Sequence, residues 1–275
     1  MKRIETILLR AREDLYSHFD GRNIALSLGQ GYDFAELRSY ELGDDIRYIS
    51  WIHAAKQGEL SIKKMYQERE LNVVLVSLLD GRFLIENKRE VLLYTLAVLG
   101  YSAYEGGDRL QVLNGIGSVW SNYPFSKGQD HLHRALTEIE SASLLGLKIN
   151  YRTVVKSILS TLQEKSLLIV LGDHLDILEI SQLAQHHEVV LLAIRASQEE
   201  DPKVLTHVEL VNPQNKKIIR QGGLGKHAIR HYVAQREAHD RTIQSTCDRY
   251  GVRWTKLFSV DEVLPALVSM FGLRT

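Results

Sequence analysis

This sequence contains little cysteine and little proline, and it has no surplus of positive or negative charge. Its 275 residues include four prolines and a single cysteine, Cys247, so an internal disulfide is excluded and a reducing compartment is indicated. Lysine plus arginine number 34, and so do aspartate plus glutamate. Binding along a phosphate backbone needs a basic surplus, and we therefore do not expect nucleic acid as a partner.

Long hydrophobic runs are missing as well. The longest apolar stretches, Val73–Leu79 and Val189–Ile194, are far shorter than the roughly 20 residues that a membrane-spanning helix needs. The amino terminus carries charges every few residues and lacks the apolar core of a secretory signal. We expect a cytoplasmic protein without a membrane span.

The signatures of common catalytic sites do not occur. Strand 73–79 is followed by Asp80–Leu84, which contains one glycine where a Rossmann turn needs several, and no P-loop, G-x-S-x-G or H-E-x-x-H motif is present. His227 and His231 share a helix face with His239, but no glutamate follows the first of them, so we interpret this as a solvated face rather than a zinc site. We expect no catalytic residues, and no cofactor apart from a weak Mg²⁺ ion at most.

The pattern that is present alternates buried strands with helices. We expect a helix from Arg3 to about Ser17, an irregular segment from Asp20 to Glu70, and a regular alternation from Leu71 onward. The predicted strands cover residues 73–79, 109–113, 167–171, 189–194, 208–211 and 252–258, and the predicted helices cover 88–104, 130–139, 153–162, 177–186, 225–249 and 261–271. Such alternation predicts an α/β fold with a doubly wound, mostly parallel sheet. We divide the chain into residues 1–70, a helix plus a small irregular module, and residues 71–275, the α/β domain.

Two carboxylates follow strands of this sheet. Asp80 ends the first strand and Asp173 ends the central one, and the carboxyl ends of parallel strands meet at the edge where ligands bind. A hard cation such as Mg²⁺ would suit the pair. Each aspartate could equally cap the turn that follows it. Both interpretations are open at this point.

A spaced set of residues in the first module carries a family resemblance. The set consists of Gly29, Gln30, Gly31, Tyr32, Asp33, Phe34, Arg38, Tyr40, Gly43, Asp44, Asp45, Arg47 and Trp51. Its order and spacing resemble the G-x-G-x-[DE]-F…R-x-Y…G-D-D-x-R…W pattern of the bacterial "domain of unknown function 58" family. Later landmarks at 73–80, 107–109 and 171–173 fit the same family.

The resemblance implies a von Willebrand factor A-like, Rossmann-like domain preceded by a family-specific module. It also implies a non-catalytic adaptor, a partner of MoxR-type AAA+ ATPases that aids the assembly or activation of a client protein complex. The alternative is metal-dependent binding of a protein ligand through a residual metal site at Asp80 and Asp173. An enzyme of unrecognised chemistry is a third, weaker hypothesis, since fold alone does not exclude catalysis.

The metal motif of such domains is altered here. The family pattern D-x-S-x-S would begin at Asp80, but Arg82 and Leu84 stand at the two serine positions. Gln129 or Asp130 would take the place of a threonine from a second loop, and Asp173 fits the third loop. We expect a degenerate metal site in which the guanidinium of Arg82 neutralises both carboxylates in place of an ion.

The first module has its own physical interpretation. Gly29 and Gly31 permit tight turns, and Asp33, Asp44 and Asp45 can cap turns. Arg38 and Arg47 are placed to bind these aspartates. Tyr40 and Trp51 would serve as buried anchors. These residues would form either a self-satisfying polar network or a docking face for a partner.

Overall fold

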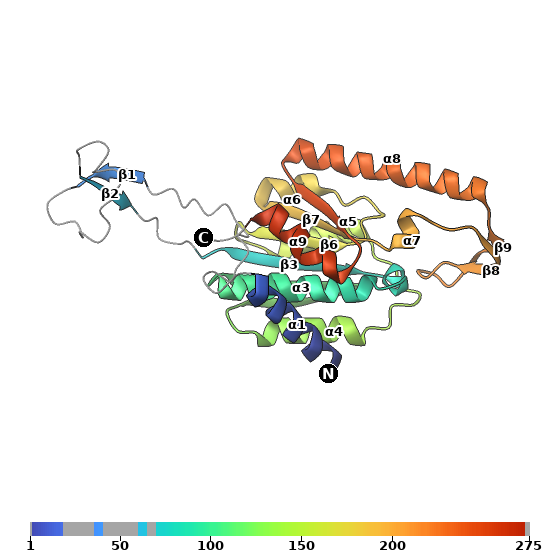
Figure 1. Ribbon diagram of the computed structural model, residues 1–275, viewed down its shortest axis with the longest axis horizontal. Coiled ribbons are helices and arrows are strands. Elements are labelled where there is room, and N and C mark those ends of the chain that lie inside the picture. Colours follow the sequence, from blue (N-terminus) through green and yellow to red (C-terminus); the bar gives the residue numbers. More distant parts are fainter. Residues whose placement is uncertain (1, 19–35, 41–59, 65–69, 273–275) are drawn as a thin grey trace. The chain divides into compact units, whose positions relative to one another are not determined.

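The computed structural model describes residues 2–18, 36–40, 60–64 and 70–272. Contacts divide the chain into two compact units: residues 1–28 together with 71–275 form one, and residues 29–70 form the other. The larger unit contains the central sheet (Figure 1).

The central sheet has six strands. In spatial order they are β10 (Arg253–Leu257), β7 (Glu188–Ile194), β6 (Leu167–Gly172), β3 (Asn72–Leu79), β4 (Arg109–Ile116) and β5 (Val119–Ser126). The first five run parallel, and β5 runs antiparallel to β4. From β3 the chain first adds β4 on one side and then β6 on the other. This confirms the predicted doubly wound, mostly parallel α/β fold and places its switch point between β3 and β6.

Helices cover both faces of the sheet. One layer consists of α1 (Lys2–His18), α3 (Lys88–Glu105), α4 (Asp130–Ser141) and α9 (Val260–Phe271), and the other of α5 (Tyr151–Thr161), α6 (Ile180–His186) and α8 (Lys226–Tyr250). Successive side chains of a strand point to opposite faces. Leu75 accordingly packs in the core beneath α3, whereas Val74 and Val76 pack in the core beneath α5 and α8. Both cores are formed by apolar side chains, which explains why the strand sequences read as continuous hydrophobic runs.

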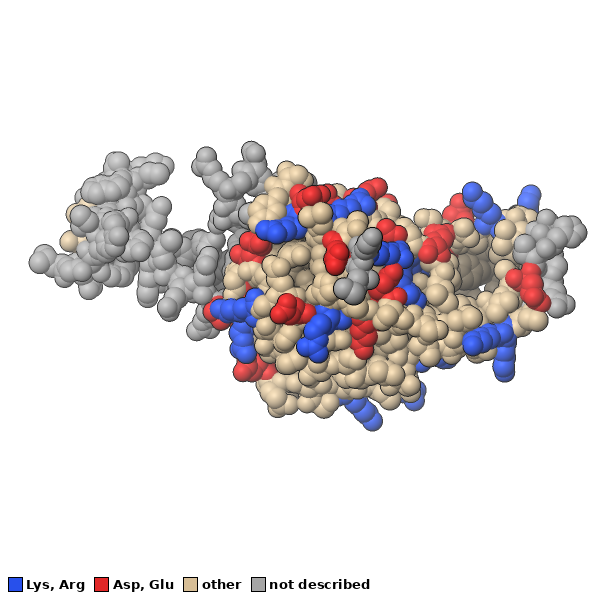
Figure 2. Space-filling model, turned by 90° about the horizontal axis from the view of Figure 1, so that it is seen from below, with Lys and Arg blue, Asp and Glu red and all other residues tan. Residues whose placement is uncertain are grey.

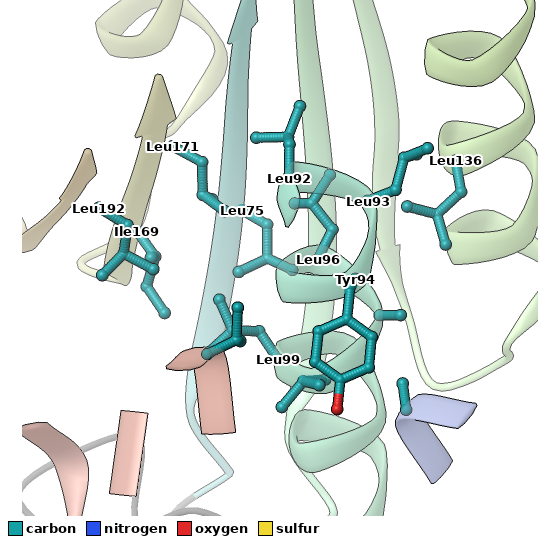
Figure 3. Packing of buried hydrophobic residues seen from close by; sticks show 14 of the residues in the cluster. Leu75, Leu92, Leu93, Tyr94, Leu96, Leu99, Leu136, Ile169, Leu171 and Leu192 are labelled. Carbon is teal, nitrogen blue, oxygen red and sulfur yellow. The ribbon is translucent and has the colours of Figure 1, made fainter. Parts of the chain in front are cut away.

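The helix α3 is buried on nearly every side. Figure 3 shows Leu92, Leu93, Leu96 and Leu99 of α3 among the leucines of the sheet and of α4. A helix that is apolar all round needs cover on its outer side as well. The amphipathic helix α1 supplies that cover with a buried stripe at helical spacing, formed by Ile4, Ile7, Leu8, Ala11 and Leu15.

The domain boundary therefore differs from the one drawn from sequence. A division at residue 70 assigns α1 to the first module, but its packing on α3 assigns it to the α/β unit, and the second unit begins at Gly29. The sequence shows that α1 is amphipathic without showing which surface its apolar stripe covers.

Two further differences concern strands. The antiparallel strand β5 was not predicted, because Val119–Ser126 alternates weakly and contains Pro124. The segment predicted as a strand at 208–211 is β8 (Leu205–Val211), which pairs antiparallel with β9 (Ile218–Leu224) in a separate hairpin and does not join the central sheet. In the described part of the chain, no helix combines the length and apolar character needed to cross a bilayer.

The smaller unit is described only in part. Strand β1 (Glu36–Ser39) pairs antiparallel with β2 (Ser61–Lys64), and the Tyr40 N–H donates to the Leu60 carbonyl at 2.9 Å. Arg38 lies in β1 opposite Ile62. The other signature residues lie outside the described residues, namely Gly29, Gln30, Gly31, Tyr32, Asp33, Phe34, Gly43, Asp44, Asp45, Arg47 and Trp51.

Candidate functional site

Asp80 and Asp173 come together at the switch point of the sheet. Strands β3 and β6 are neighbours, with Ser77 opposite Leu171, and each aspartate directly follows its strand. Both carboxylates are buried, and both also cap the following turn: Asp80 Oδ1 accepts from the Arg82 N–H at 2.9 Å, and Asp173 Oδ1 accepts from the Leu175 N–H at 3.1 Å. Capping and a shared site thus coexist here.

The guanidinium of Arg82 lies among three carboxylates. Its Nη2 is 2.9 Å from Asp80 Oδ2 and 2.9 Å from Asp176 Oδ2, and its Nε is 2.8 Å from Asp173 Oδ2. Burial alone would lower the pKa of Arg82, but the charge of Asp173 and the hydrogen bond to Asp80 outweigh it and raise that pKa above its ordinary value. Arg82 is therefore a permanent cation at this edge.

A second cation, Lys88, was not anticipated from the sequence. It is the first residue of α3 and is 0% exposed, and its Nζ lies 2.9 and 3.0 Å from the two carboxylate oxygens of Glu199 and 3.6 Å from Asp173 Oδ2. A lysine in the first turn opposes the helix dipole. That unfavourable placement is the sequence signal that could have pointed to nearby carboxylates holding the ammonium in place.

These residues form one cluster of four carboxylates and two cations, which we call the edge cluster: Asp80, Asp173, Asp176, Glu199, Arg82 and Lys88. Burial raises the pKa of Asp173, but Lys88 and Arg82 reverse this effect and lower it below its ordinary value. Asp176, whose side chain is 46% exposed, is the member that faces solvent.

A third loop reaches the cluster from an unexpected part of the chain. Ser126, the last residue of β5, lies opposite Leu110 near the start of β4. The loop that holds Gln129 and Asp130 therefore lies at the opposite edge of the sheet from Asp80. The assignment of Gln129 or Asp130 to the site was wrong because β5 runs antiparallel. The loop between α4 and α5 takes that place: the Gly81 N–H donates to the Leu147 carbonyl at 3.0 Å.

Tyr151, at the start of α5, donates its hydroxyl to Asp173 Oδ1 at 3.4 Å. Burial, followed by the charge of Asp173, raises the pKa of Tyr151 well above its usual value, so the hydroxyl remains a donor.

Two cations occupy the space around the carboxylates of the edge cluster that a divalent ion would need. Arg82 and Lys88 already lie against the carboxylate oxygens that would be ligands, and Leu84 offers no oxygen in its side chain. Among the described residues, no group of three or more histidine, cysteine, aspartate or glutamate side chains is arranged to hold a metal.

A neighbouring cluster lies where α8 crosses the ends of β7 and β10. Arg195 is fully buried, and its Nη2 donates to Asp240 Oδ1 at 3.1 Å and to the carbonyl of His174 at 3.4 Å. Lys256 donates to Asp240 Oδ2 at 2.6 Å. His239 binds the same His174 carbonyl through Nε2 at 2.9 Å, while His227 and His231 are exposed, so these three histidines do not converge.

His174 is a strained and buried residue beside Asp173. Its φ is 48°, in the left-handed region, and its Nε2 lies 3.2 Å from the Val170 carbonyl. Burial lowers the pKa of His174 from 6.5 to about 4. The folded state therefore favours the neutral imidazole: this contribution to stability is complete above pH 6.5 and is lost as the pH falls from 6.5 toward 4.

We expect this histidine to dominate the mildly acidic part of the stability profile. Between pH 7.5 and pH 5, the wild type should lose about 2 kcal/mol more unfolding free energy than His174→Asn, which tolerates the same backbone conformation. Urea unfolding at several pH values measures the difference, with His227→Asn on the exposed face of α8 as the control. If the unfolding free energies of the wild type and of His174→Asn changed in parallel with pH, His174 would not be the source of this pH dependence.

Comparison with known proteins agrees with the resemblance seen in the sequence. The family model described as "Protein of unknown function DUF58" matches residues 36–243. Similar curated proteins include an uncharacterized protein of Mycobacterium bovis and uncharacterized proteins of two Mycobacterium tuberculosis strains. Each is 23% identical over 201 residues, covering 70% of this chain and 63% of the relative. The chain thus spans somewhat less than two thirds of the length of these relatives. On the family match, the chain belongs to the DUF58 family.

Proposed function

We propose that this protein is a non-catalytic adaptor that binds other proteins at the carboxyl edge of its sheet. The observation that carries the proposal is a set of four exposed apolar side chains from the segments at this edge of the sheet, which we call the apolar ring. Leu84 and Ile177 lie in the segments that follow β3 and β6. Val119 lies opposite the last residue of β4, and Leu145 lies in the loop that binds Gly81. Ile177 and Val119 are 62% and 61% exposed. Exposed apolar side chains gathered at one part of a surface mark protein interaction sites.

The chemistry of the edge cluster favours binding over catalysis. Its cations lie against its own carboxylates, and the imidazole of His174 is buried with Nε2 at a backbone carbonyl. A general base must reach the proton that it removes, and this imidazole faces the protein interior. Among the described residues at this edge, we find no pair of nucleophile and base.

As the partner we propose a MoxR-type AAA+ ATPase, and as the purpose the assembly or activation of a client complex. The proposal draws on the resemblance of the signature residues and on membership of the family. The von Willebrand A type of the domain and its degenerate metal site belong to the same proposal. An adaptor of this kind would bring a client to the ATPase, whose hydrolysis supplies the work, and would act in the cytoplasm.

The test is binding to a purified MoxR-type ATPase from the same host, measured by biolayer interferometry with and without ATP. Ile177→Asp places a charge in the apolar ring and should weaken binding at least tenfold. Leu9→Asp, at a similarly exposed leucine of α1 (57% against 62%), is the matched control and should bind as the wild type does. Equal affinities for all three proteins would contradict docking at this edge. Retained binding in EDTA without nucleotide would separate this proposal from metal-dependent binding.

A further inference from the structure

The turn of the β8–β9 hairpin sits on the edge cluster. Gln214 donates its side-chain amide to Asp80 Oδ2 at 2.6 Å, and the Gly146 N–H donates to the Pro213 carbonyl at 2.7 Å. The fit is close, since a Cβ added at Gly81 would lie 2.0 Å from the Pro213 oxygen. Asp80 Oδ2 is also the oxygen that accepts from Arg82 Nη2. A segment 134 residues along the chain thus satisfies an acceptor at the centre of the proposed docking edge.

The turn keeps its shape through its own hydrogen bonds. The Asn212 N–H donates to the Lys217 carbonyl at 2.8 Å, and the Lys216 N–H donates to the Asn212 carbonyl at 2.8 Å. The Asn212 side chain accepts from the Gln214 N–H at 2.9 Å. These bonds lie within the turn, so it can leave the edge as a rigid piece and return to the same place.

The strands behind the turn have little to hold them. Among the described residues, β8 and β9 pair only with each other, and a two-stranded hairpin has marginal stability alone. Their side chains Val211, Ile218 and Ile219 are 45%, 53% and 66% exposed. Figure 1 shows the hairpin at the right-hand end of the unit, beyond α7 (Ser197–Glu200) and below the start of α8, and Figure 2 shows the same end projecting from the main body.

We propose that this turn, residues 212–217, is a releasable cover over Asp80 and Arg82, and that a partner displaces it when it docks. The inference rests on the proposed function for the partner and concerns the regulation of the same edge. In the closed state Gln214 occupies the Asp80 oxygen and Pro213 fills the space above Gly81. In the open state the turn has left the edge. A partner that binds only this open state shifts the equilibrium between closed and open toward the open state, by the difference in its affinity for the two states.

Hydrogen exchange followed by NMR tests the cover in the full chain. The Gly146 amide should exchange by local opening, at least a hundredfold faster than amides of β6 such as that of Val170. Gln214→Ala, which removes the amide donor without adding bulk, should speed Gly146 exchange about tenfold further. Gly81→Ala, whose added Cβ would push the turn away, should also speed the exchange of the Gly146 amide. Gly225→Ala is the control, because its Cβ would meet nothing within 4 Å. If the Gly146 and Val170 amides were equally protected in the wild type, or if Gln214→Ala left the exchange rate of Gly146 unchanged, the proposal that the turn is a releasable cover would be overturned.

Binding to the MoxR-type ATPase tests its regulatory role. Gln214→Ala should bind at least threefold more tightly than the wild type, because the cost of opening is already reduced. Equal or weaker binding by Gln214→Ala would overturn displacement by the partner. If wild type and open variants all fail to bind the ATPase, the proposed partner is wrong, and hydrogen exchange alone decides whether the cover opens.

Discussion

Replacing Lys88 with methionine should lower the free energy of unfolding by about 3–5 kcal/mol. The Lys88 ammonium is completely buried between Glu199 and Asp173, and methionine fills most of its volume without its charge. Two buried carboxylates would then lose the ammonium that lies between them. Because Lys88 is a main cause of the lowered pKa of Asp173, its loss raises that pKa, and the deficit in unfolding free energy relative to the wild type should shrink as the pH falls and Asp173 binds a proton. Urea unfolding at pH 7 and at lower pH, followed by circular dichroism, measures both effects.

A second variant separates lost charge from lost packing. In Lys88→Met with Glu199→Gln, the uncompensated carboxylate is gone, while the amide oxygen can still accept from the Ala196 N–H as Glu199 does at 2.9 Å. We expect this double variant to regain about half of the lost free energy, since neutral replacement of a buried ion pair is well tolerated. Lys165→Met, at an exposed lysine, should stay within about 0.5 kcal/mol of the wild type. A loss below about 1 kcal/mol in Lys88→Met would contradict the role of this ion pair.

The sequence was most informative where local pattern and burial coincide. The strand Val73–Leu79 is covered on both faces, so its apolar run was recognisable and its carboxyl end, with Asp80, could be placed at the ligand edge. Asp173 follows from the same reasoning. The metal motif implied by the family resemblance added the expectation that Arg82 would stand between them, because an arginine occupies its first serine position.

The rest of the site depends on contacts that no local pattern encodes. Glu199 and Gln214 reach the cluster from 111 and 134 residues away, on a four-residue helix and on a turn outside the sheet. The misplaced loop at Gln129 has a related cause: the antiparallel strand β5 was not recognised, and it carries that loop back to the opposite edge of the sheet. Only the assembled sheet decides which loops share an edge.

Replacing Arg82 with serine should produce a response to divalent ions that the wild type lacks. The variant regains an oxygen ligand two residues after Asp80 and leaves Asp80, Asp173 and Asp176 without their shared guanidinium. Without added metal, we expect a loss of about 1–3 kcal/mol from repulsion among these carboxylates. An ion at ten times its dissociation constant should restore about 1.4 kcal/mol. That gain corresponds to a rise of a few degrees in Tm, which thermal unfolding with MnCl₂ or EDTA measures.

Two control variants show which property of Arg82 keeps the ion out. Arg82→Lys keeps the positive charge but loses the fork that reaches several carboxylates, so it should lose stability and still show no response to Mn²⁺. Arg152→Ser, at an exposed arginine of α5, should behave as the wild type in both conditions. A wild-type Tm that rises at micromolar Mg²⁺ or Mn²⁺, with the rise abolished by Asp80→Ala, would show that an ion binds beside Arg82 and would overturn its role as the replacement. If only the serine variant responds, the positive charge at residue 82 is what distinguishes this edge from a metal site.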